Sequence, residues 1–414
     1  MSVDFVSTRS DQQSAADARK LFAATFDTEP EGVWAAPGRV NLIGEHVDYA
    51  GGICLPFALT QVTVAAMSRR EDRVISIASV MPGGTEANTF EIDLSEVGPQ
   101  SPANWAGYAA GSVWAAVEAG LMPATGFNIA LVSDVPLGAG LSSSAALECS
   151  VALGAVELAT GKAPDADIRE KLIACCIRAE NEVVGASTGG LDQTISLLGT
   201  RGHALEIDYA DNSTTQVPAD FAGNDLAILV INTNAPHSLA DGQYASRRGI
   251  IDQVTAALGG KSLRDVAQPV EKAREWAVTH TPDTDDKDDF LNMVGRRVRH
   301  VVSEIERTAG AVEELKRADF KAFGVSMCAS HASLRDDYEV TCPELDSAVD
   351  AAMEAGALGA RMTGGGFGGS AIALIPADTV DKVAEAVAAA AADNNLATPE
   401  FLVAVPSDGA RRLQ

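Results

Sequence analysis

Residues 135–146 read VPLGAGLSSSAA, and the fold of the surrounding chain depends on how this stretch is interpreted. Small residues lead into a run of serines, and an alanine-rich apolar segment follows without a break. This pattern predicts a loop that opens directly into a helix, because glycine permits tight bends and close approach of the backbone to a ligand. Free N–H groups at a helix start favour an anion, most often a phosphate. The serine hydroxyls could cap the helix or bind a metal ion held by that phosphate.

An ordinary strand-to-helix turn with a serine N-cap would explain the same stretch. The loop is not of the Walker type, because the lysine of the G-K-[ST] ending is missing. The rest of the chain must therefore separate a phosphate loop from a capped turn.

The composition is that of a globular, soluble protein with two or three domains. The chain has 414 residues, of which 46% are hydrophobic and 21% are charged. The excess of 57 acidic over 31 basic residues gives a formal net charge of -26. This charge argues against a general surface for nucleic acid or an anionic membrane, although a local basic pocket for an anionic substrate remains compatible with it.

The cysteines and the N-terminal segment both favour a cytoplasmic protein. The chain contains six cysteines and no CxxC pair, so we expect buried free thiols in a reducing compartment. The segment MSVDFVSTRSDQQ has neither the basic start nor the apolar core of a signal peptide. No apolar run approaches the length of a membrane span.

Hydrophobic periodicity predicts a mixture of helices and strands. The expected helices lie at 12–27, 104–119, 143–160, 167–184, 243–258, 289–309 and 379–392. The expected strands lie at 53–68, 73–79, 126–133, 225–233, 359–363, 370–375 and 401–405, with a strand pair near 195–208. The order is not a regular βαβ alternation, so the expected fold class is α+β with mixed sheets. We expect two units, residues 1–210 and 211–414.

Residues 33–52, VWAAPGRVNLIGEHVDYAGG, read as a short apolar strand, then a polar stretch dense in charged side chains, then a glycine pair. Arg39, Glu45, His46 and Asp48 lie there between glycines and a proline, which implies a fixed loop. Carboxylates and an imidazole suit sugar hydroxyls, because an ionised carboxylate offers two acceptor oxygens. Arg39 could stabilise charge on a phosphoryl group or on a nearby base. A solvated loop with a salt bridge is the alternative.

Two further acidic residues lie near a glycine pair. Glu180 is late in a predicted helix, and Asp192 begins an apolar run, so Asp192 could be a simple N-cap. Alternatively, Glu180 is a metal ligand and Asp192 a base. Magnesium on a nucleotide usually takes only one or two protein oxygens, so one serine and one carboxylate would suffice.

A second glycine-rich loop, MTGGGFGGSAIAL, occupies residues 362–374. Glycines at positions 364–366, 368 and 369 are costly in backbone entropy, which suggests close approach to a ligand or another strand. A tight turn beside a buried Phe367 is the alternative. His237 follows the predicted strand 225–233, where a ligand could bind, although a lone histidine there is more often structural.

Three segments resemble known family motifs and occur in the family order. GRVNLIGEHVDYAGG resembles the galactokinase signature. VPLGAGLSSSAALE and MTGGGFGGSAIAL resemble the phosphate loop and third motif of the GHMP small-molecule kinases, which include homoserine, mevalonate and galactose kinases. The first motif is specific to galactokinases and their near relatives, and the similarity extends over nearly the whole chain. The resemblance implies a two-domain kinase with its active site between the domains, which uses ATP and Mg²⁺ to form galactose 1-phosphate.

The resemblance also implies roles for individual residues. It implies a sugar pocket made by Glu45, His46, Val47, Asp48, Gly189 and Tyr244. It implies that the ATP phosphates lie along Gly138, Ala139, Gly140, Leu141, Ser142, Ser143 and Ser144, with Trp105 near the adenine. It implies that Ser144 and Glu180 hold magnesium. Asp192 would face the anomeric hydroxyl as a base or an orienting group, with Arg39 beside it.

Some positions depart from the commoner family pattern. Val47, Ala50 and the pair Gly190-Leu191 differ, which could alter sugar preference without touching a proposed catalytic side chain. A kinase for N-acetylgalactosamine or arabinose is therefore the nearest alternative. A non-catalytic sensor of galactose and ATP is disfavoured, because residues 142–145 and Asp192 are all present. The expected protein is a monomer that binds a sugar and ATP, with no nucleic-acid or membrane partner.

Overall fold

The computed structural model describes residues 3–80, 87–186, 188–235, 240–282 and 286–414. Its helices are α1 (Asp11–Phe26), α2 (Trp105–Glu118), α3 (Ser143–Thr160), α4 (Ala166–Arg178), α5 (Leu191–Leu198), α6 (Ala240–Ala257), α7 (Pro269–His280), α8 (Lys287–Lys316), α9 (Phe320–Ser333), α10 (Pro343–Glu354) and α11 (Val380–Asp393). Its strands are β1 (Gly32–Asn41), β2 (Ile53–Cys54), β3 (Pro56–Arg69), β4 (Val74–Val80), β5 (Ala87–Asp93), β6 (Phe127–Ser133), β7 (His203–Asp208), β8 (Ser213–Pro218), β9 (Leu226–Asn232), β10 (Gly359–Thr363), β11 (Ser370–Pro376), β12 (Glu400–Ala404) and β13 (Arg411–Arg412).

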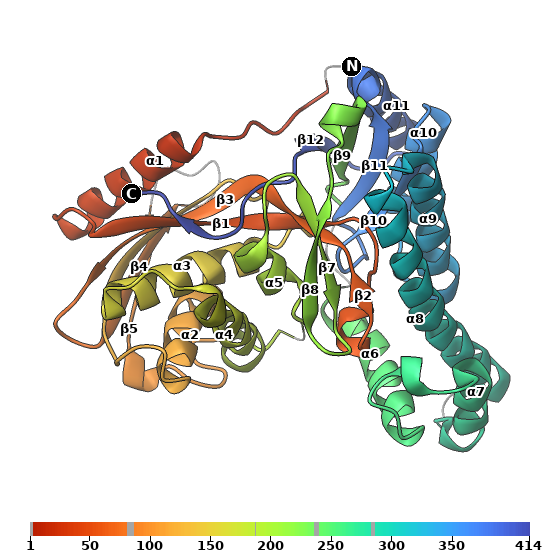
Figure 1. The fold of residues 1–414 in the computed structure, drawn as a ribbon, viewed down its shortest axis with the longest axis horizontal. Coiled ribbons are helices and arrows are strands. Elements are labelled where there is room, and N and C mark those ends of the chain that lie inside the picture. The colour runs from red at the N-terminus through yellow and green to blue at the C-terminus, as the bar shows by residue number, and fades with distance from the viewer. Residues whose placement is uncertain (1–2, 81–86, 187, 236–239, 283–285) are drawn as a thin grey trace.

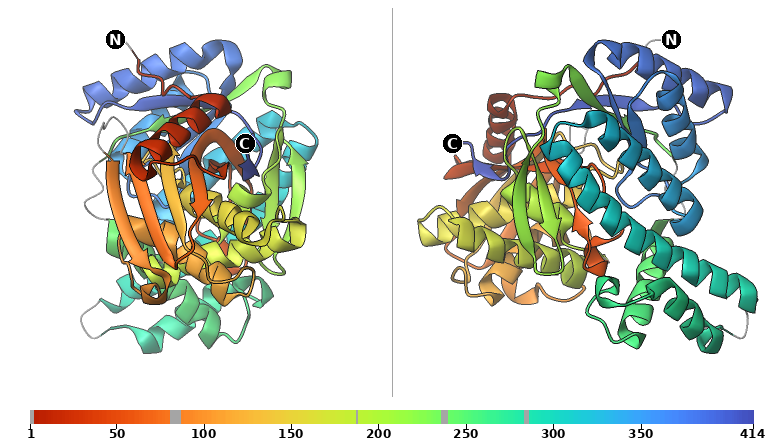
Figure 2. Two further views of the ribbon diagram at one scale, coloured as in Figure 1. Left: turned by 90° about the vertical axis from the view of Figure 1, so that its left-hand side faces the viewer. Right: turned by 45° about the vertical axis from the view of Figure 1, so that its right-hand side comes forward.

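A six-stranded sheet in the order β13-β1-β3-β6-β4-β5 has helices on both faces. Helix α1 lies across one face, while α2, α3 and α4 lie on the other (Figures 1 and 2). The alternation of side chains along β1 explains this arrangement, because neighbouring residues of a strand point to opposite faces. Val33 and Ala35 share a core with α1, whereas Trp34 and Ala36 share a core with α2 and α3.

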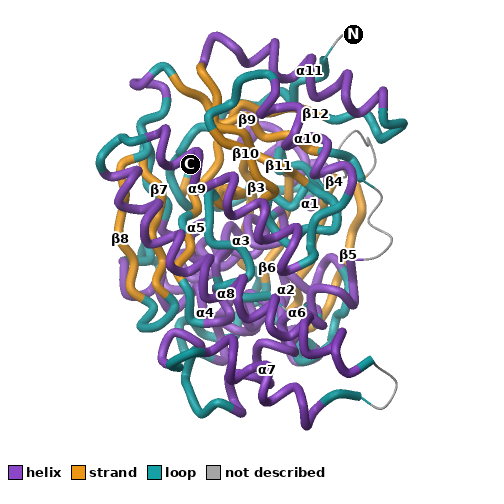
Figure 3. Tube along the Cα trace, turned by 90° about the vertical axis from the view of Figure 1, so that its right-hand side faces the viewer, coloured by secondary structure: helices purple, strands orange, loops and turns teal. Residues whose placement is uncertain are grey.

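A four-stranded antiparallel sheet in the order β10-β11-β9-β12 forms the second layer system. Strand β9 alternates in the same way. Leu229 and Ile231 belong to the core that includes residues of α10 and α11, and Ile228 and Val230 belong to the core that includes α9. Helices α6 and α7 lie at one end of the molecule, which Figure 3 shows from the side.

A third sheet has the order β2-β7-β8. The six-stranded and four-stranded sheets are joined by buried side chains and by the chain termini. One core combines Leu42 and Phe57 with Val230 and Ile372, so the apolar interior continues from one half of the chain into the other. Strand β13 pairs with β1 in the six-stranded sheet. The division into units 1–210 and 211–414 stays a prediction, although residues 411–412 complete a sheet of the first unit.

The structure confirms the α+β class with mixed sheets and most of the expected elements. The strand pair near 195–208 is wrong, because residues 191–198 form α5 and the pair consists of β7 and β8. The buried Leu191 and Ile195 lie four positions apart, which suits one face of a helix as well as an apolar strand. Strands β5 and β8 were not expected, because most of their side chains are exposed or half-buried and give little periodic signal.

The cysteines are free thiols, four of them buried and two half-buried. Along the residues that the structure describes, none of the helices combines the length and apolar content that crossing a membrane would require.

Candidate active site

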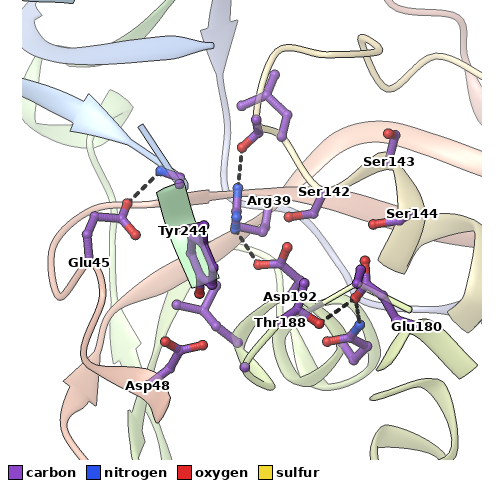
Figure 4. A pocket seen from close by; sticks show the side chains of 18 of the residues that line it. Arg39, Glu45, Asp48, Ser142, Ser143, Ser144, Glu180, Thr188, Asp192 and Tyr244 are labelled. Carbon is purple, nitrogen blue, oxygen red and sulfur yellow. Dashed lines mark hydrogen bonds and ion pairs between the residues drawn. The ribbon is translucent and has the colours of Figure 1, made fainter. Parts of the chain in front are cut away.

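A cavity of about 600 Å³ lies where β1, the start of α3, α5, α6 and the second glycine-rich loop meet. Its lining includes Arg39, Glu45, His46, Asp48, Gly138, Gly140, Leu141, Ser142, Ser143, Ser144, Glu180, Thr188, Gly189, Asp192, Gln193, Tyr244, Gly364 and Gly365. Figure 4 shows Glu45, Asp48 and Tyr244 on one side of this space and Ser143, Ser144 and Glu180 on the other. Most residues predicted from separate motifs therefore face a single cavity.

Arg39 and Asp192 form an ion pair in the middle of this cavity. Arg39 Nε donates to Asp192 Oδ1 at 2.8 Å, and Arg39 Nη1 donates to the carbonyl oxygen of Gly140 at 2.5 Å (Figure 4). Arg39 lies on β1 with a side chain that is only 8% exposed. Gly140 precedes α3, so one guanidinium connects the opening loop to the carboxylate.

The N-cap interpretation of Asp192 is wrong. The N-cap of α5 is Gly190, and Asp192 lies in the first helical turn. Its carboxylate is bonded to Arg39 instead of to the backbone of the helix start. Because this geometry places an acidic group beside a guanidinium in a cavity, Asp192 is available to a ligand.

The opening loop has the backbone that its glycines predicted. Gly138 and Gly140 have φ of 71° and 70°, a left-handed conformation that favours glycine. Ser142 is the N-cap of α3 with φ of 61°, but its side chain makes no capping bond. Within the described chain its Oγ has no hydrogen-bond partner. The residues at this helix start line the cavity, so N–H groups that could bind an anion lie at its wall.

The second glycine-rich loop packs against the opening loop. Ser370 Oγ donates to the carbonyl oxygen of Ala139 at 2.7 Å. A Cβ atom on Gly364, where φ is +84°, would lie 3.0 Å from the carbonyl oxygen of Gly140. The glycines therefore serve a close approach between two backbone segments, as well as lining the cavity.

Glu180 lies on a π-helical turn, Ala179–Val184, beneath the start of α3. Its Oε2 accepts hydrogen bonds from Thr188 Oγ1 at 2.9 Å and from Gln193 Nε2 at 2.6 Å, and its side chain also bonds that of Ser144. Burial raises the pKa of Glu180, and the charge of Asp192 adds to this effect. Its described partners are all neutral, so the carboxylate lacks a compensating cation.

A second glutamate is buried behind Glu180. Glu148 on α3 accepts a hydrogen bond from Gln193 Nε2 at 3.0 Å, so one amide bonds both carboxylates. Glu148 Oε1 has no partner among the described residues. Burial, followed by the charge of Glu180, raises the pKa of Glu148 well above its usual range. Burial therefore disfavours the charged form of Glu148.

On the opposite side, Glu45 is surrounded by donors. Its Oε1 accepts hydrogen bonds from the Gly364 N–H at 2.8 Å and from Thr363 Oγ1 at 3.2 Å. Arg361 Nη1 lies 3.4 Å from the same oxygen, and the Arg361 side chain is fully buried. Arg361 also lies near Glu304, whose Oε1 accepts a hydrogen bond from Ser330.

Asp48 and Gly189 are in direct contact. A Cβ atom on Gly189 would lie only 1.6 Å from Asp48 Oδ2, so any other residue at position 189 would displace the carboxylate. Burial raises the pKa of Asp48 to about 6, and the charges of Asp192 and Glu45 contribute to the shift. Asp192 and Glu45 therefore lie close enough to influence the ionisation of Asp48.

His46 is buried among aromatic rings beside the sugar-side carboxylates. Its ring centroid lies 5.1 Å from that of Tyr244 and 5.0 Å from that of Tyr338. Burial lowers the pKa of His46 to about 3, and nearby positive charge, first that of His300, adds to the shift. The imidazole is therefore neutral near pH 7.

Three of the predicted site residues lie outside the described lining of the cavity. Val47 is buried in the apolar core and contacts Gly52, and Ala139 is buried behind the opening loop. Trp105 begins α2 and is 37% exposed. His237 falls outside the described residues.

Sequence reasoning missed several residues that support the site, namely Glu148, Thr188, Gln193, Arg361 and Thr363. Arg361 left a visible signal, because it is the single charged residue of the strand β10. Glu148 left a weaker one, because it is one of two charged residues, with Glu157, in the largely apolar helix α3. A buried charge almost always has a partner, so such a residue marks a polar contact. The sequence does not show which distant residue that partner is.

Family comparisons match three parts of the chain. Residues 20–69 match the galactokinase galactose-binding signature. Residues 108–200 match the N-terminal domain of GHMP kinases, and residues 311–393 match the C-terminal part of GHMP kinases. The matched segments contain the loop of Glu45, the opening loop with Asp192, and the second glycine-rich loop, respectively.

Whole-chain comparisons agree with these matches. The chain is 46% identical over 394 residues to a galactokinase of Streptomyces coelicolor, which covers 95% of this chain and 97% of that protein. It is 41% identical to human galactokinase, with 96% of each chain covered. The crystal structure of Lactococcus lactis galactokinase complexed with galactose superposes with a TM-score of 0.83 at 31% identity, covering 96% of this chain and 99% of that one. A mevalonate kinase of Methanococcus jannaschii shares the fold, with a TM-score of 0.59 at 16% identity.

Proposed function

This chain belongs to the galactokinase family of the GHMP kinases, and from that membership we propose that it transfers the terminal phosphoryl group of ATP to the anomeric hydroxyl of D-galactose. The products are galactose 1-phosphate and ADP. The observation that carries this proposal is the Arg39–Asp192 pair, which lies between the sugar-side carboxylates and the start of α3.

Glu45, Asp48 and Tyr244 are proposed to bind the sugar. Two carboxylates and a phenol in one wall of the cavity offer acceptors for several hydroxyl groups. Contact with Gly189 fixes the Asp48 carboxylate from one side. A bound sugar thereby presents one hydroxyl toward Asp192.

Asp192 is proposed to accept a hydrogen bond from the anomeric hydroxyl and to receive its proton, or to orient that hydroxyl as the phosphoryl group arrives. Arg39 forms an ion pair with this carboxylate and adds positive charge near the transferring group. Phosphoryl transfer asks little covalent chemistry of a protein, so positioning and charge stabilisation supply most of the rate.

The phosphates of ATP are proposed to lie along Gly138 and residues 140–144. The left-handed backbone before α3 and the free N–H groups at its start support this placement. Ala139 contributes by its backbone contact with Ser370. Trp105 remains a proposed contact of the adenine, because it is exposed at the start of α2.

Ser144 and Glu180 are proposed to hold Mg²⁺. Their hydroxyl and carboxylate oxygens are the ligand type that this ion prefers, and one or two protein ligands suffice. In the described part of the chain, no group of three or more His, Cys, Asp or Glu side chains forms a metal site. When bound, the ion would neutralise charge on the nucleotide phosphates. The buried, uncompensated carboxylate of Glu180 supports the assignment.

We further propose a monomeric, cytoplasmic enzyme. The free cysteines support the location, because reducing compartments keep thiols reduced. Light scattering of the purified protein checks the oligomeric state.

A panel of sugars in an ADP-release assay tests the substrate. We expect galactose to give the highest kcat/KM, above N-acetylgalactosamine and arabinose. A better substrate among the other two would overturn the sugar assignment and leave the kinase assignment standing. Galactose binding without ADP release would instead identify a sensor.

The variant Asp192→Asn tests the central carboxylate in the same assay. We expect kcat to fall by about 10²–10⁴-fold, the usual contribution of a positioned acid or base. The matched control is Asp408→Asn, which removes an exposed carboxylate paired with Arg201 and should keep the wild-type kcat. Near wild-type turnover of Asp192→Asn would remove Asp192 from the mechanism.

A further inference from the structure

A chain of hydrogen bonds runs through His46 and connects segments that are distant in sequence. His46 Nε2 lies 3.1 Å from the carbonyl oxygen of Gly365, in the second glycine-rich loop. His46 Nδ1 lies 3.1 Å from the Tyr49 hydroxyl, which lies 2.8 Å from the Tyr338 hydroxyl. Tyr338 ends a π-helical turn, Leu334–Tyr338, that no motif singled out.

One carbonyl group determines the direction of every bond in this chain. A carbonyl oxygen only accepts, so His46 Nε2 must carry the proton that it shares with Gly365. The neutral imidazole has a single N–H, so Nδ1 must accept a hydrogen bond from Tyr49. Tyr49 has one O–H and donates it to His46, so its oxygen accepts from Tyr338.

The surroundings of His46 favour the neutral ring that this argument requires. The imidazole packs between Tyr244 and Tyr338, and both His300 and Arg247 lie close enough to disfavour an added positive charge. His300 has hydrogen-bond partners of its own. Its Nε2 lies 3.1 Å from the Glu45 carbonyl oxygen, and its Nδ1 lies 2.9 Å from Ser333 Oγ. The carbonyl again requires an N–H at Nε2, so His46 and His300 each donate to a backbone carbonyl oxygen.

The backbone of His46 also needs support. Its φ is 59°, a left-handed conformation that is strained for a residue with a Cβ and persists only where neighbouring contacts hold it. The neighbouring residues Glu45 and Asp48 are the proposed sugar ligands. The left-handed backbone at His46 therefore lies next to Glu45 and two residues before Asp48.

We propose that Tyr49 and Tyr338 are positioning residues that hold His46 as the Nε2–H tautomer. In this tautomer the ring donates to the carbonyl oxygen of Gly365 and fixes the segment from Glu45 to Asp48. The ring does not bond the sugar. Both ring nitrogens are occupied by partners within the chain, which leaves neither for a hydroxyl of the substrate. This inference rests on the proposed function for its effect on sugar binding, whereas the tautomer itself does not.

Nitrogen-15 NMR of histidine-labelled protein tests the tautomer without sugar or nucleotide. We expect His46, assigned from the spectrum of His46→Gln, to show a protonated Nε2 and an unprotonated Nδ1 at pH 7, with or without saturating galactose. An Nδ1–H or charged ring, or a loss of the Nε2–H signal to the sugar, would overturn the proposal. Neither result bears on which sugar is phosphorylated, so failure here is distinct from failure of the kinase assignment.

Phenylalanine variants test the two tyrosines. Tyr49→Phe removes the donor to Nδ1, so we expect a mixture of tautomers and a five- to tenfold rise in KM for galactose, about the effect of one hydrogen bond. Tyr338→Phe should shift the Nδ1 resonance less and raise this KM less. The KM for ATP should stay unchanged in both.

Tyr209→Phe is the matched control, because Tyr209 is a largely buried tyrosine outside this chain of hydrogen bonds. It should leave the His46 spectrum as in the wild type. If Tyr49→Phe does not fold, the wild-type tautomer and the Tyr338→Phe shift still decide the proposal. A wild-type spectrum in both tyrosine variants would remove their positioning role.

Discussion

On the sugar side of the cavity, Glu45 faces the buried guanidinium of Arg361, whereas on the phosphate side Glu180 is bonded by neutral side chains such as Thr188 and Gln193. Both carboxylates are buried and both line the same space. The difference lies in the charge of their partners. Glu45 has a cationic partner within the chain, and Glu180 has none among the described residues.

The buried carboxyl groups of Glu180 and Glu148 on the phosphate side have no cationic partner among the described residues. Gln193 bonds Glu180 and Glu148 with one amide nitrogen, and burial raises the pKa of both carboxyl groups. An uncompensated buried charge is unfavourable, so it is retained where a ligand supplies the missing charge. This difference supports the proposal that a cation binds on the phosphate side, beside Glu180.

The largest expected effect comes from removing Arg361, the cationic partner of Glu45. Arg361→Met would leave Glu45 and Glu304 buried without that guanidinium. Removing one partner of a buried ion pair typically costs about 3–5 kcal/mol, so the free energy of unfolding should fall by this amount. Urea denaturation followed by intrinsic fluorescence measures it.

Arg411→Met is the control for this variant. Arg411 pairs with Asp11 at the surface, where the two side chains are 23% and 47% exposed. Exposed pairs contribute about 0–1 kcal/mol. If Arg361→Met lowers the free energy of unfolding no more than the control does, Arg361 does not stabilise the buried Glu45.

Removing the charge of Glu180 on the phosphate side should instead increase the free energy of unfolding. Glu180→Gln removes a buried charge without a cationic partner, so the protein free of metal and nucleotide should gain about 0.5–2 kcal/mol near neutral pH. The Mg²⁺ concentration for half-maximal activity should rise at least about tenfold. Denaturation and a magnesium titration of ADP release measure the two effects.

The pH dependence of stability follows from the same charge. Burial first, and then Asp192, raises the pKa of Glu180 in the folded state, so the folded protein binds the proton more tightly than the unfolded chain does. The stabilisation is present below the unfolded pKa and is lost as pH rises through the folded pKa. Glu180→Gln should flatten this slope, while Glu182→Gln, at an exposed pair with Arg178, should keep it. If Glu180→Gln instead lowers the free energy of unfolding, the buried carboxylate of Glu180 is stabilised within the chain, as that of Glu45 is.

The smallest expected effect is on sugar binding as a function of pH. The pKa of Asp48 is raised to about 6, chiefly by burial and then by Asp192 and Glu45. Because the ionised carboxylate is the better hydroxyl acceptor, KM for galactose should rise about tenfold per pH unit below about 6. In Asp48→Asn, KM should be high at every pH. A flat KM in the wild type between pH 7 and 5 would remove Asp48 from sugar binding.

Features that depend on the spacing of neighbouring residues could be predicted from the sequence. The glycines and serines of residues 138–144 predicted a loop before a helix, and α3 begins at Ser143. Contacts across the fold could not be predicted in this way. Arg361 and Glu45 lie 316 positions apart, and no periodicity of either segment specifies the other.

Apolar segments of ambiguous period were the other source of error. Residues 191–198 combine aliphatic residues with Thr194, a composition that strands and short buried helices share. Tertiary packing of Leu191 and Ile195 decides the outcome, and the sequence contains no measure of it.

The pairing of β13 with β1 has a consequence for the order in which the protein folds during synthesis. Until residues 411–412 leave the ribosome, β1 is the outer strand of its sheet, with hydrogen-bonding groups near Trp34 and Ala35 unpaired. Arg411 also bonds Asp11, 400 positions earlier. The N-terminal sheet therefore cannot be completed while the second half of the chain is still being made, and its open edge is exposed to neighbouring nascent chains for that time.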